Sequence, residues 1–331
     1  MEYIADRVFG KENRTYLMGL SMLWIVIFHI CTWSDAAGVN TFRFLKLFVD
    51  GSIGVDVFLL LSAYGLQASI EKNRISKFYL NRIKRLFPVY FFFLATLFLT
   101  YENDCPFSRM MIQTLYQITG LSLFKYQDFF SCGFCFDWFT PAIITIYLFF
   151  PLISIVVKKV ISRGFSFELF FLILLIVFGV WVRENKHFPF GLLALRFPIL
   201  FLGCTFFIHL KNGALNKVLS LCFISGCIGL LTGNLEMKRS LILLPLLLAF
   251  SLTRFNLPLK KIVCLVGKHS YEIYLAHIIL VAFFIPSKTV SNFYLLCIIT
   301  LISSMIIAGF YYYMNYIFYY FCGFVKKAIN A

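Results

Sequence analysis

Long apolar runs separated by short polar segments make up most of the chain. Stretches of about 18 or more largely apolar residues recur along it, which is the signature of transmembrane helices. The runs are continuous, as in residues 241–250, and do not alternate as the strands of a membrane β-barrel do. The pattern predicts an all-α, polytopic integral membrane helix bundle with about ten transmembrane helices. The predicted spans lie near residues 16–34, 51–70, 86–101, 138–157, 166–182, 190–209, 216–233, 239–253, 265–285 and 292–321.

The bundle forms a single predicted domain over residues 1–331. Its longest external segment, residues 102–137, is shorter than the roughly 50 residues that a separate enzymatic domain needs. Any chemistry must therefore take place in the helices and their loops. The sequence shows no internal repeat, which argues against a transporter built from inverted repeats.

The composition supports a membrane location and indicates an orientation. The chain is 61% hydrophobic and 14% charged, whereas a soluble domain carries roughly 25% charged residues. Its net charge of +15 comes from clusters between the spans, which is typical of cytoplasmic loops and not of nucleic-acid binding. With the N-terminus inside, 20 Lys and Arg residues fall in cytoplasmic segments and 9 outside. We therefore predict an integral protein of the plasma (inner) membrane with both termini cytoplasmic.

The ten cysteines do not indicate a metal site. Cys132 and Cys135 form a single CxxC pair, but a structural zinc site needs four ligands, so no metal is expected. If the loop faces an oxidising space, a disulfide among Cys105, Cys132 and Cys135 is an open alternative.

Ionisable side chains within the spans are the first candidates for chemistry, because they are costly in lipid and tend to mark function. Each has an alternative role as a structural bridge between helices, and for Asp56 a helix cap near the outer surface is the favoured alternative. His209 lies close to Lys211 and is predicted to be interfacial. The candidates are His29, Asp56, Arg196, Glu272 and His277.

A basic cluster before the third span is the second candidate. Arg82 and Arg85 are three residues apart and should share a helix face. Pro88 is expected to bend or start the helix that enters the membrane. The cluster has two open interpretations: a positive-inside anchor, or a phosphate-binding pair of guanidinium groups.

Six segments in order resemble the acyltransferase family 3 membrane proteins, which include O-antigen and capsule O-acetyltransferases. None is specific alone, but their order along the chain is. They are GLSMLWIVIFH, GSIGVDVFLLLSAYGL, FYLNRIKRLFPVY, DWFTPAIITIYLFFPLI, LRFPILFLGC and VGKHSYEIYLAH.

The resemblance implies a membrane O-acyltransferase. Such proteins take an acyl group, usually acetyl, from cytoplasmic acyl-CoA and deliver it to a sugar hydroxyl at the outer face. The family's central His corresponds to His29, but the family's Arg eleven residues earlier is Met18 here. Arg14 lies one turn before Met18 and can share its face. In the family's LSG segment, Ala63 replaces the glycine.

The expected mechanism uses His29 as general base, with Asp56 beside it to fix its tautomer and His277 along the acyl path. Arg82, Arg85 and Arg14 are expected to hold acyl-CoA, in most cases acetyl-CoA. The expected partners are a glycan or lipid-linked sugar acceptor and membrane lipids, with no nucleic acid. The alternatives are a transporter or flippase, a glycan polymerase, and a non-catalytic relative, which the Met18 departure leaves open. The acceptor sugar, the acyl group and the oligomeric state stay open.

Overall fold

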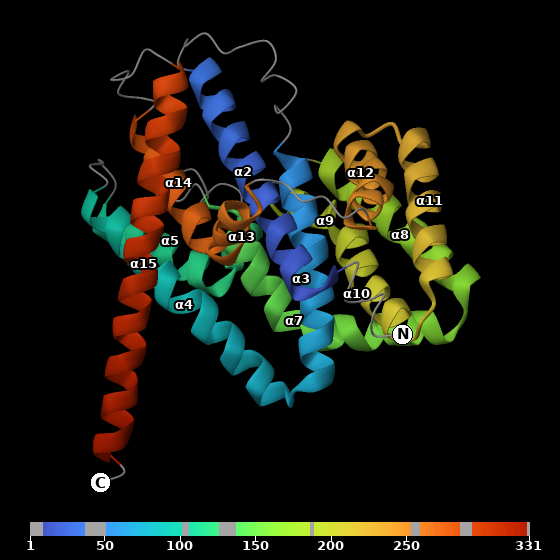
Figure 1. Ribbon diagram of the computed structural model, residues 1–331, viewed down its shortest axis with the longest axis horizontal. Helices are drawn as coiled ribbons and strands as arrows, with labels where there is room; N and C mark the ends of the chain where they lie inside the picture. Colours follow the sequence, from blue (N-terminus) through green and yellow to red (C-terminus); the bar gives the residue numbers. More distant parts are fainter. Residues whose placement is uncertain are drawn as a thin grey trace.

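A computed structural model describes residues 9–36, 51–100, 106–125, 137–185, 189–252, 259–284 and 293–329. Within these ranges every regular element is helical, and they contain no β-strand. Helices α2 and α3 lie in the middle, α8 to α12 form one side, and α4, α5 and α15 form the other (Figure 1). In chain order the elements are α2 (Lys11–Ala36), α3 (Ser52–Lys72), α4 (Ile75–Thr100), α5 (Phe107–Thr119), the short 3₁₀ helix η2 (Leu121–Leu123), α7 (Phe139–Ser162), α8 (Phe165–Glu184), α9 (Phe190–Ala194), α10 (Phe197–Lys211), α11 (Leu215–Leu231), α12 (Leu235–Leu252), α13 (Lys260–Lys268), α14 (Ser270–Phe284) and α15 (Phe293–Ile329).

The all-α membrane bundle predicted from the sequence is confirmed. Within the described residues, six segments are long and apolar enough to cross a membrane, and they belong to α2, α3, α7, α8, the α9–α10 pair and α15. The predicted spans 216–233 and 239–253 correspond to α11 and α12, the span 86–101 to the second part of α4, and the span 265–285 begins in α13 and continues in α14. The total of ten crossings stays a prediction.

The outer surface of the bundle is apolar where lipid would contact it. On α8, Phe170, Leu174, Val177 and Trp181 are exposed, and their spacing of three or four residues places them on one helix face. A water-soluble monomer rarely exposes a continuous apolar face made of several large side chains. The face therefore fits a helix that packs against the bundle on one side and against lipid on the other.

Two glycines let the short helix α13 pack directly on α2. A Cβ atom on Gly267 would lie 1.8 Å from the carbonyl oxygen of Thr15, and one on Gly19 would lie 2.0 Å from that of Val263. Small residues of this kind allow the backbones of membrane helices to approach closely. The contact brings Lys268, the last residue of α13, to the end of α2 that carries Lys11 and Arg14.

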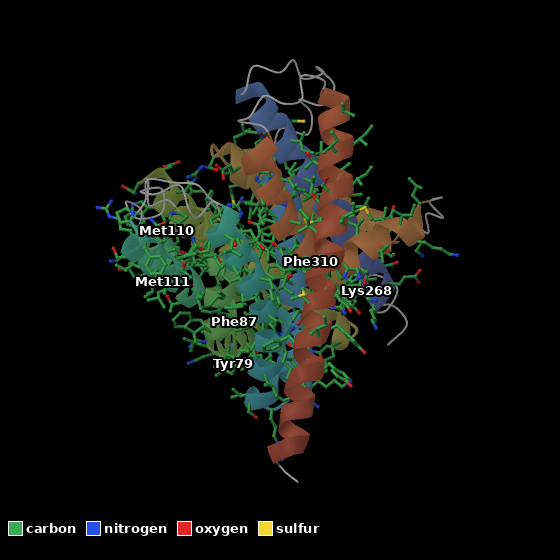
Figure 2. The ribbon with its side chains drawn as sticks, turned by 90° about the vertical axis from the view of Figure 1, so that its left-hand side faces the viewer. Tyr79, Phe87, Met110, Met111, Lys268 and Phe310 are labelled. Atoms are coloured by element: carbon green, nitrogen blue, oxygen red, sulfur yellow. The ribbon has the colours of Figure 1, made fainter. Side chains whose placement is uncertain are left out.

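Helix α15 lies along α4, and its C-terminal end extends beyond the other helices (Figures 1 and 2). Tyr311 on α15 donates a hydrogen bond to the hydroxyl of Thr96 at 3.3 Å, and the Tyr319 hydroxyl donates to the carbonyl of Lys84. The expectation that Pro88 starts the membrane helix is wrong, because α4 begins at Ile75 and includes Pro88 in its interior. The alternative, that Pro88 bends the helix, stays a prediction. Neighbouring helices can compensate for an interior proline in a membrane helix.

The position of His209 at the membrane interface stays a prediction, and the structure places this residue in the last turn of α10. Its side chain is 3% exposed, and its Nε2 lies 2.8 Å from Oε2 of Glu168, which is fully buried on α8. Burial favours such a pair only when both polar groups are bonded. His209 therefore joins α10 to α8 inside the bundle.

Candidate active site

A cavity of about 430 Å³ opens where α2, α3, α4, α7 and α13 meet. We call it the basic cavity, because five cationic side chains line it and none of its lining residues is acidic. Clustered cations with no carboxylate among the lining residues favour an anion with several negative charges, although Glu272 lies within electrostatic range of Arg85. The five are Lys11, Arg14, Arg82, Arg85 and Lys268.

Arg14 and Arg82 line the basic cavity, and aromatic rings contact both guanidinium groups. The Nε atoms of both are buried and have no hydrogen-bond partner in the structure. Arg14 lies 5.7 Å from the ring centroid of Tyr64, and Arg82 lies 5.1 Å from that of Phe78. The aromatic rings hold the guanidinium groups at the wall of the cavity by cation–π contact.

The structure therefore brings Arg14, Arg82 and Arg85 together, as the sequence analysis expected for the donor site. Arg82 and Arg85 share the face of α4 that lines the cavity. Met18 also lines this cavity. Arg14 thus supplies a cation one turn away from Met18, where the family resemblance implied an arginine.

A second cavity of about 350 Å³ lies further along α2, and we call it the histidine cavity. His29 lines it together with Trp138, Arg196, Glu236 and Arg239. Fifteen residues separate Arg14 from His29, which corresponds to a rise of about 22 Å along a helix. The two cavities therefore lie at different depths of the same bundle.

His29 and His277 are in direct contact, although they are 248 residues apart in the sequence. Nδ1 of His29 lies 3.0 Å from Nε2 of His277. His277 is fully buried, and its Nδ1 lies 3.3 Å from the carbonyl oxygen of Ile273, one turn earlier on α14. The sequence singled out both histidines but did not predict that they meet.

The expected contact between Asp56 and His29 is not made, and this interpretation needs correction. Oδ1 of Asp56 lies 3.3 Å from Nε of Arg196, and the Ser240 hydroxyl donates to Oδ2. Both charged side chains are at most 4% exposed. A buried carboxylate is stable only when paired, and Arg196 provides that pair.

The ion pair continues toward the histidine cavity. Arg196 lies 3.9 Å from Oε2 of Glu236 and 5.5 Å from the ring centroid of Trp138. Oε1 of Glu236 accepts a 2.9 Å hydrogen bond from Arg183. This network connects α3, α8, α12 and the residue before α10, so Asp56 orients Arg196 at the cavity instead of acting on His29.

Aromatic side chains separate the two cavities. Phe139 lines both of them and is 4% exposed. The centroid of its ring lies 5.6 Å from that of Phe58, which lines the basic cavity. It lies 5.1 Å from the ring centroid of Tyr274, which lines the histidine cavity. A molecule that uses both cavities must pass this partition.

Asp137 fixes the position of Phe139. Its Oδ1 accepts 3.0 Å hydrogen bonds from the backbone N–H groups of Phe139 and Thr140, and a 2.8 Å bond from the Tyr274 hydroxyl. Burial raises the pKa of Asp137, while these hydrogen bonds act in the opposite direction. The start of α7 is thereby tied to α14 beside the histidine pair.

Sequence reasoning missed Asp137, Trp138, Tyr274 and Glu236 as site residues. The first three lie in the segments 137–153 and 266–277, which carry part of the family resemblance. These segments could therefore have pointed to them as site residues. Glu236 lies in the first turn of α12, and no periodic pattern in the sequence singles it out. Cys105, Cys132 and Cys135 lie outside the described residues, and among those described no group of three or more His, Cys, Asp or Glu side chains could hold a metal.

Comparison with known proteins supports the resemblance. A family model described as "Acyltransferase domain" matches residues 15–325, which include the residues that line the histidine cavity and all that line the basic cavity except Lys11 and Arg14. Neither the curated proteins nor the solved structures give a match. Since the family model covers most of the chain, this integral membrane protein belongs to the acyltransferase family 3 membrane proteins.

Proposed function

We propose that the protein is an O-acyltransferase that moves an acyl group, in the first instance acetyl, from cytoplasmic acyl-CoA to a hydroxyl of a cell-surface or lipid-linked polysaccharide. The observation that carries the proposal is the pair of cavities along α2. Five cations line one of them, and a histidine lines the other. A donor with phosphates at one end and a reactive carbonyl at the other fits this arrangement.

The basic cavity suits the phosphates of CoA. Guanidinium groups bind phosphate oxygens through charge-assisted, often bidentate hydrogen bonds, and Arg14, Arg82 and Arg85 line this cavity. Placing this cavity at the cytoplasmic end agrees with the excess of Lys and Arg in the predicted inside segments. The pantetheine arm would extend past Phe139 and bring the thioester to His29.

The histidine cavity suits a sugar hydroxyl. The half-buried indole of Trp138 and the charged groups of Arg196, Glu236 and Arg239 line this cavity and offer both an apolar surface and hydrogen-bonding partners. Ligand sites commonly combine an apolar lining with a few oriented polar groups. On the proposed topology this cavity faces the outer side, where a polysaccharide or its lipid-linked precursor would arrive.

The proposed reaction is a direct transfer. His29 takes the proton of the acceptor hydroxyl, and the oxygen forms a bond to the thioester carbonyl carbon as general-base catalysis requires. The C–S bond breaks, and the CoA thiolate leaves and receives the proton. The products are an O-acyl sugar and CoA thiol. A C–O bond has replaced the C–S bond, the hydroxyl proton has moved to the sulfur, and the proposed step uses no metal.

The test is acyl transfer by the purified protein in nanodiscs. Acetyl-CoA labelled in the acetyl group is supplied with polysaccharide from cells that lack the gene, and label in the glycan is measured. The proposal predicts label that alkali releases as acetate, as an ester requires, and that depends on both substrates. Absence of glycan labelling by folded protein, together with uptake of the glycan into sealed vesicles, would instead support a transporter.

A further inference from the structure

His29 and His277 form a hydrogen-bonded relay. The positions of its protons follow from the acceptor at its end, the carbonyl oxygen of Ile273. The relay starts at the carbonyl oxygen of Ile273, passes through Nδ1 and Nε2 of His277, and reaches Nδ1 of His29. His277 has no exposed surface, whereas His29 is half-buried and lines the histidine cavity. Only His29 can therefore meet a substrate.

A carbonyl oxygen can only accept a hydrogen bond, so Nδ1 of His277 must carry a proton. In a neutral imidazole the other nitrogen is then an acceptor. Nε2 of His277 accordingly accepts a bond from Nδ1–H of His29. That assignment leaves Nε2 of His29 without a proton, which is the state a general base requires.

We propose that His277 is a positioning residue that fixes the tautomer of His29, so that the unprotonated Nε2 is the atom that serves the histidine cavity. This inference rests on the proposed function for its role in catalysis, but the tautomer itself does not depend on the substrate. His277 thus has the role that the sequence suggested for Asp56, which is to fix the tautomer of His29. A neutral partner replaces the carboxylate that commonly orients a catalytic histidine.

The relay also defines where the charge goes during transfer. When the acceptor O–H bond breaks and a new N–H bond forms at Nε2, His29 becomes an imidazolium with protons on both nitrogens. Its Nδ1–H still donates to the lone pair of His277, so the new charge keeps a hydrogen-bond partner in a site with little water. The proton then passes from Nε2 to the leaving CoA thiolate, and the relay returns to its starting state.

The experiment compares His277→Leu with His277→Gln in the full-length protein in nanodiscs. Leucine fills the space without an acceptor, whereas the side-chain oxygen of glutamine can accept from Nδ1–H of His29 and its amide can donate to Ile273. We expect His277→Leu to lower kcat about 10²-fold or more with unchanged KM for acetyl-CoA. We expect His277→Gln to recover most of that loss. His209→Gln, a change at a buried histidine outside both cavities, is the matched control and should keep normal kcat.

A second readout does not require acyl transfer. Diethylpyrocarbonate acylates unprotonated imidazole nitrogen, and peptide mass spectrometry gives its rate at His29. The rate should fall several-fold in His277→Leu and recover in His277→Gln, even if the proposed function is wrong. Normal kcat and a normal His29 modification rate in folded His277→Leu would overturn the relay while leaving the acyltransferase proposal intact.

Discussion

Asp56 and Arg196 form an ion pair inside the bundle, with 3.3 Å between Oδ1 and Nε and at most 4% of either side chain exposed. The pair joins α3 to the start of α10, and Arg196 continues from it to the wall of the histidine cavity. Asp56, which the sequence suggested as a partner of His29, therefore supports another residue that lines the same cavity, Arg196.

Removing one partner of this ion pair should destabilise the protein strongly. Asp56→Ala leaves the Arg196 charge buried without its carboxylate, which costs about 3–5 kcal/mol. The double variant Asp56→Leu with Arg196→Met removes both charges and should recover most of the lost stability. Thermal unfolding in detergent measures both effects. Equal stability of Asp56→Ala and the parent protein would show that the pair does not hold these helices together.

The arginines of the basic cavity should control donor binding. Replacing Arg82 and Arg85 by Ala should raise the KM for acetyl-CoA tenfold or more, because charge-assisted hydrogen bonds contribute about 1.5–3 kcal/mol each. The KM for the glycan should change little. Lys77→Ala with Lys84→Ala is the matched control, since it removes two positive charges from the same helix at positions that do not line the cavity. Equal donor KM values in the two double variants would assign Arg82 and Arg85 to membrane anchoring alone.

Phe139 should keep water away from the donor. Its ring stands between the two cavities, and exclusion of water prevents hydrolysis of reactive groups. We expect Phe139→Ala to release CoA faster than the parent protein when acetyl-CoA is supplied without an acceptor. Phe139→Leu, which keeps most of the volume, should behave more like the parent. An unchanged rate of acceptor-free CoA release in Phe139→Ala would exclude a barrier role for this ring.

The orientation of the protein can be tested without any substrate. The excess of Lys and Arg in the predicted inside segments predicts that both termini lie in the cytoplasm and that residues 102–137 lie outside. Alkaline phosphatase and green fluorescent protein fusions after Lys77 and after Asp128 should therefore report opposite sides. Reporters that place both positions on the same side would overturn this topology and the assignment of the basic cavity to the cytoplasm.

The sequence predicted the helical membrane bundle because long apolar runs can satisfy their backbone in lipid only as helices. It also predicted that Arg82 and Arg85 share a face, since a spacing of three residues settles that within one helix. The contact between His29 and His277 could not be predicted, because it depends on how α2 and α14 pack across 248 residues of sequence. The partner of Asp56 was missed for the same reason, as depth in the membrane alone did not distinguish His29 from Arg196.

The most direct test of the account is the turnover of His29→Gln. Glutamine keeps hydrogen-bonding groups at this position but cannot act as a base near neutral pH. The account predicts that the variant inserts and folds normally, binds acetyl-CoA with unchanged affinity, and loses about 10²–10⁴-fold in kcat. Near-normal kcat in His29→Gln would contradict the account, because the proton of the acceptor hydroxyl would then have to pass to another residue.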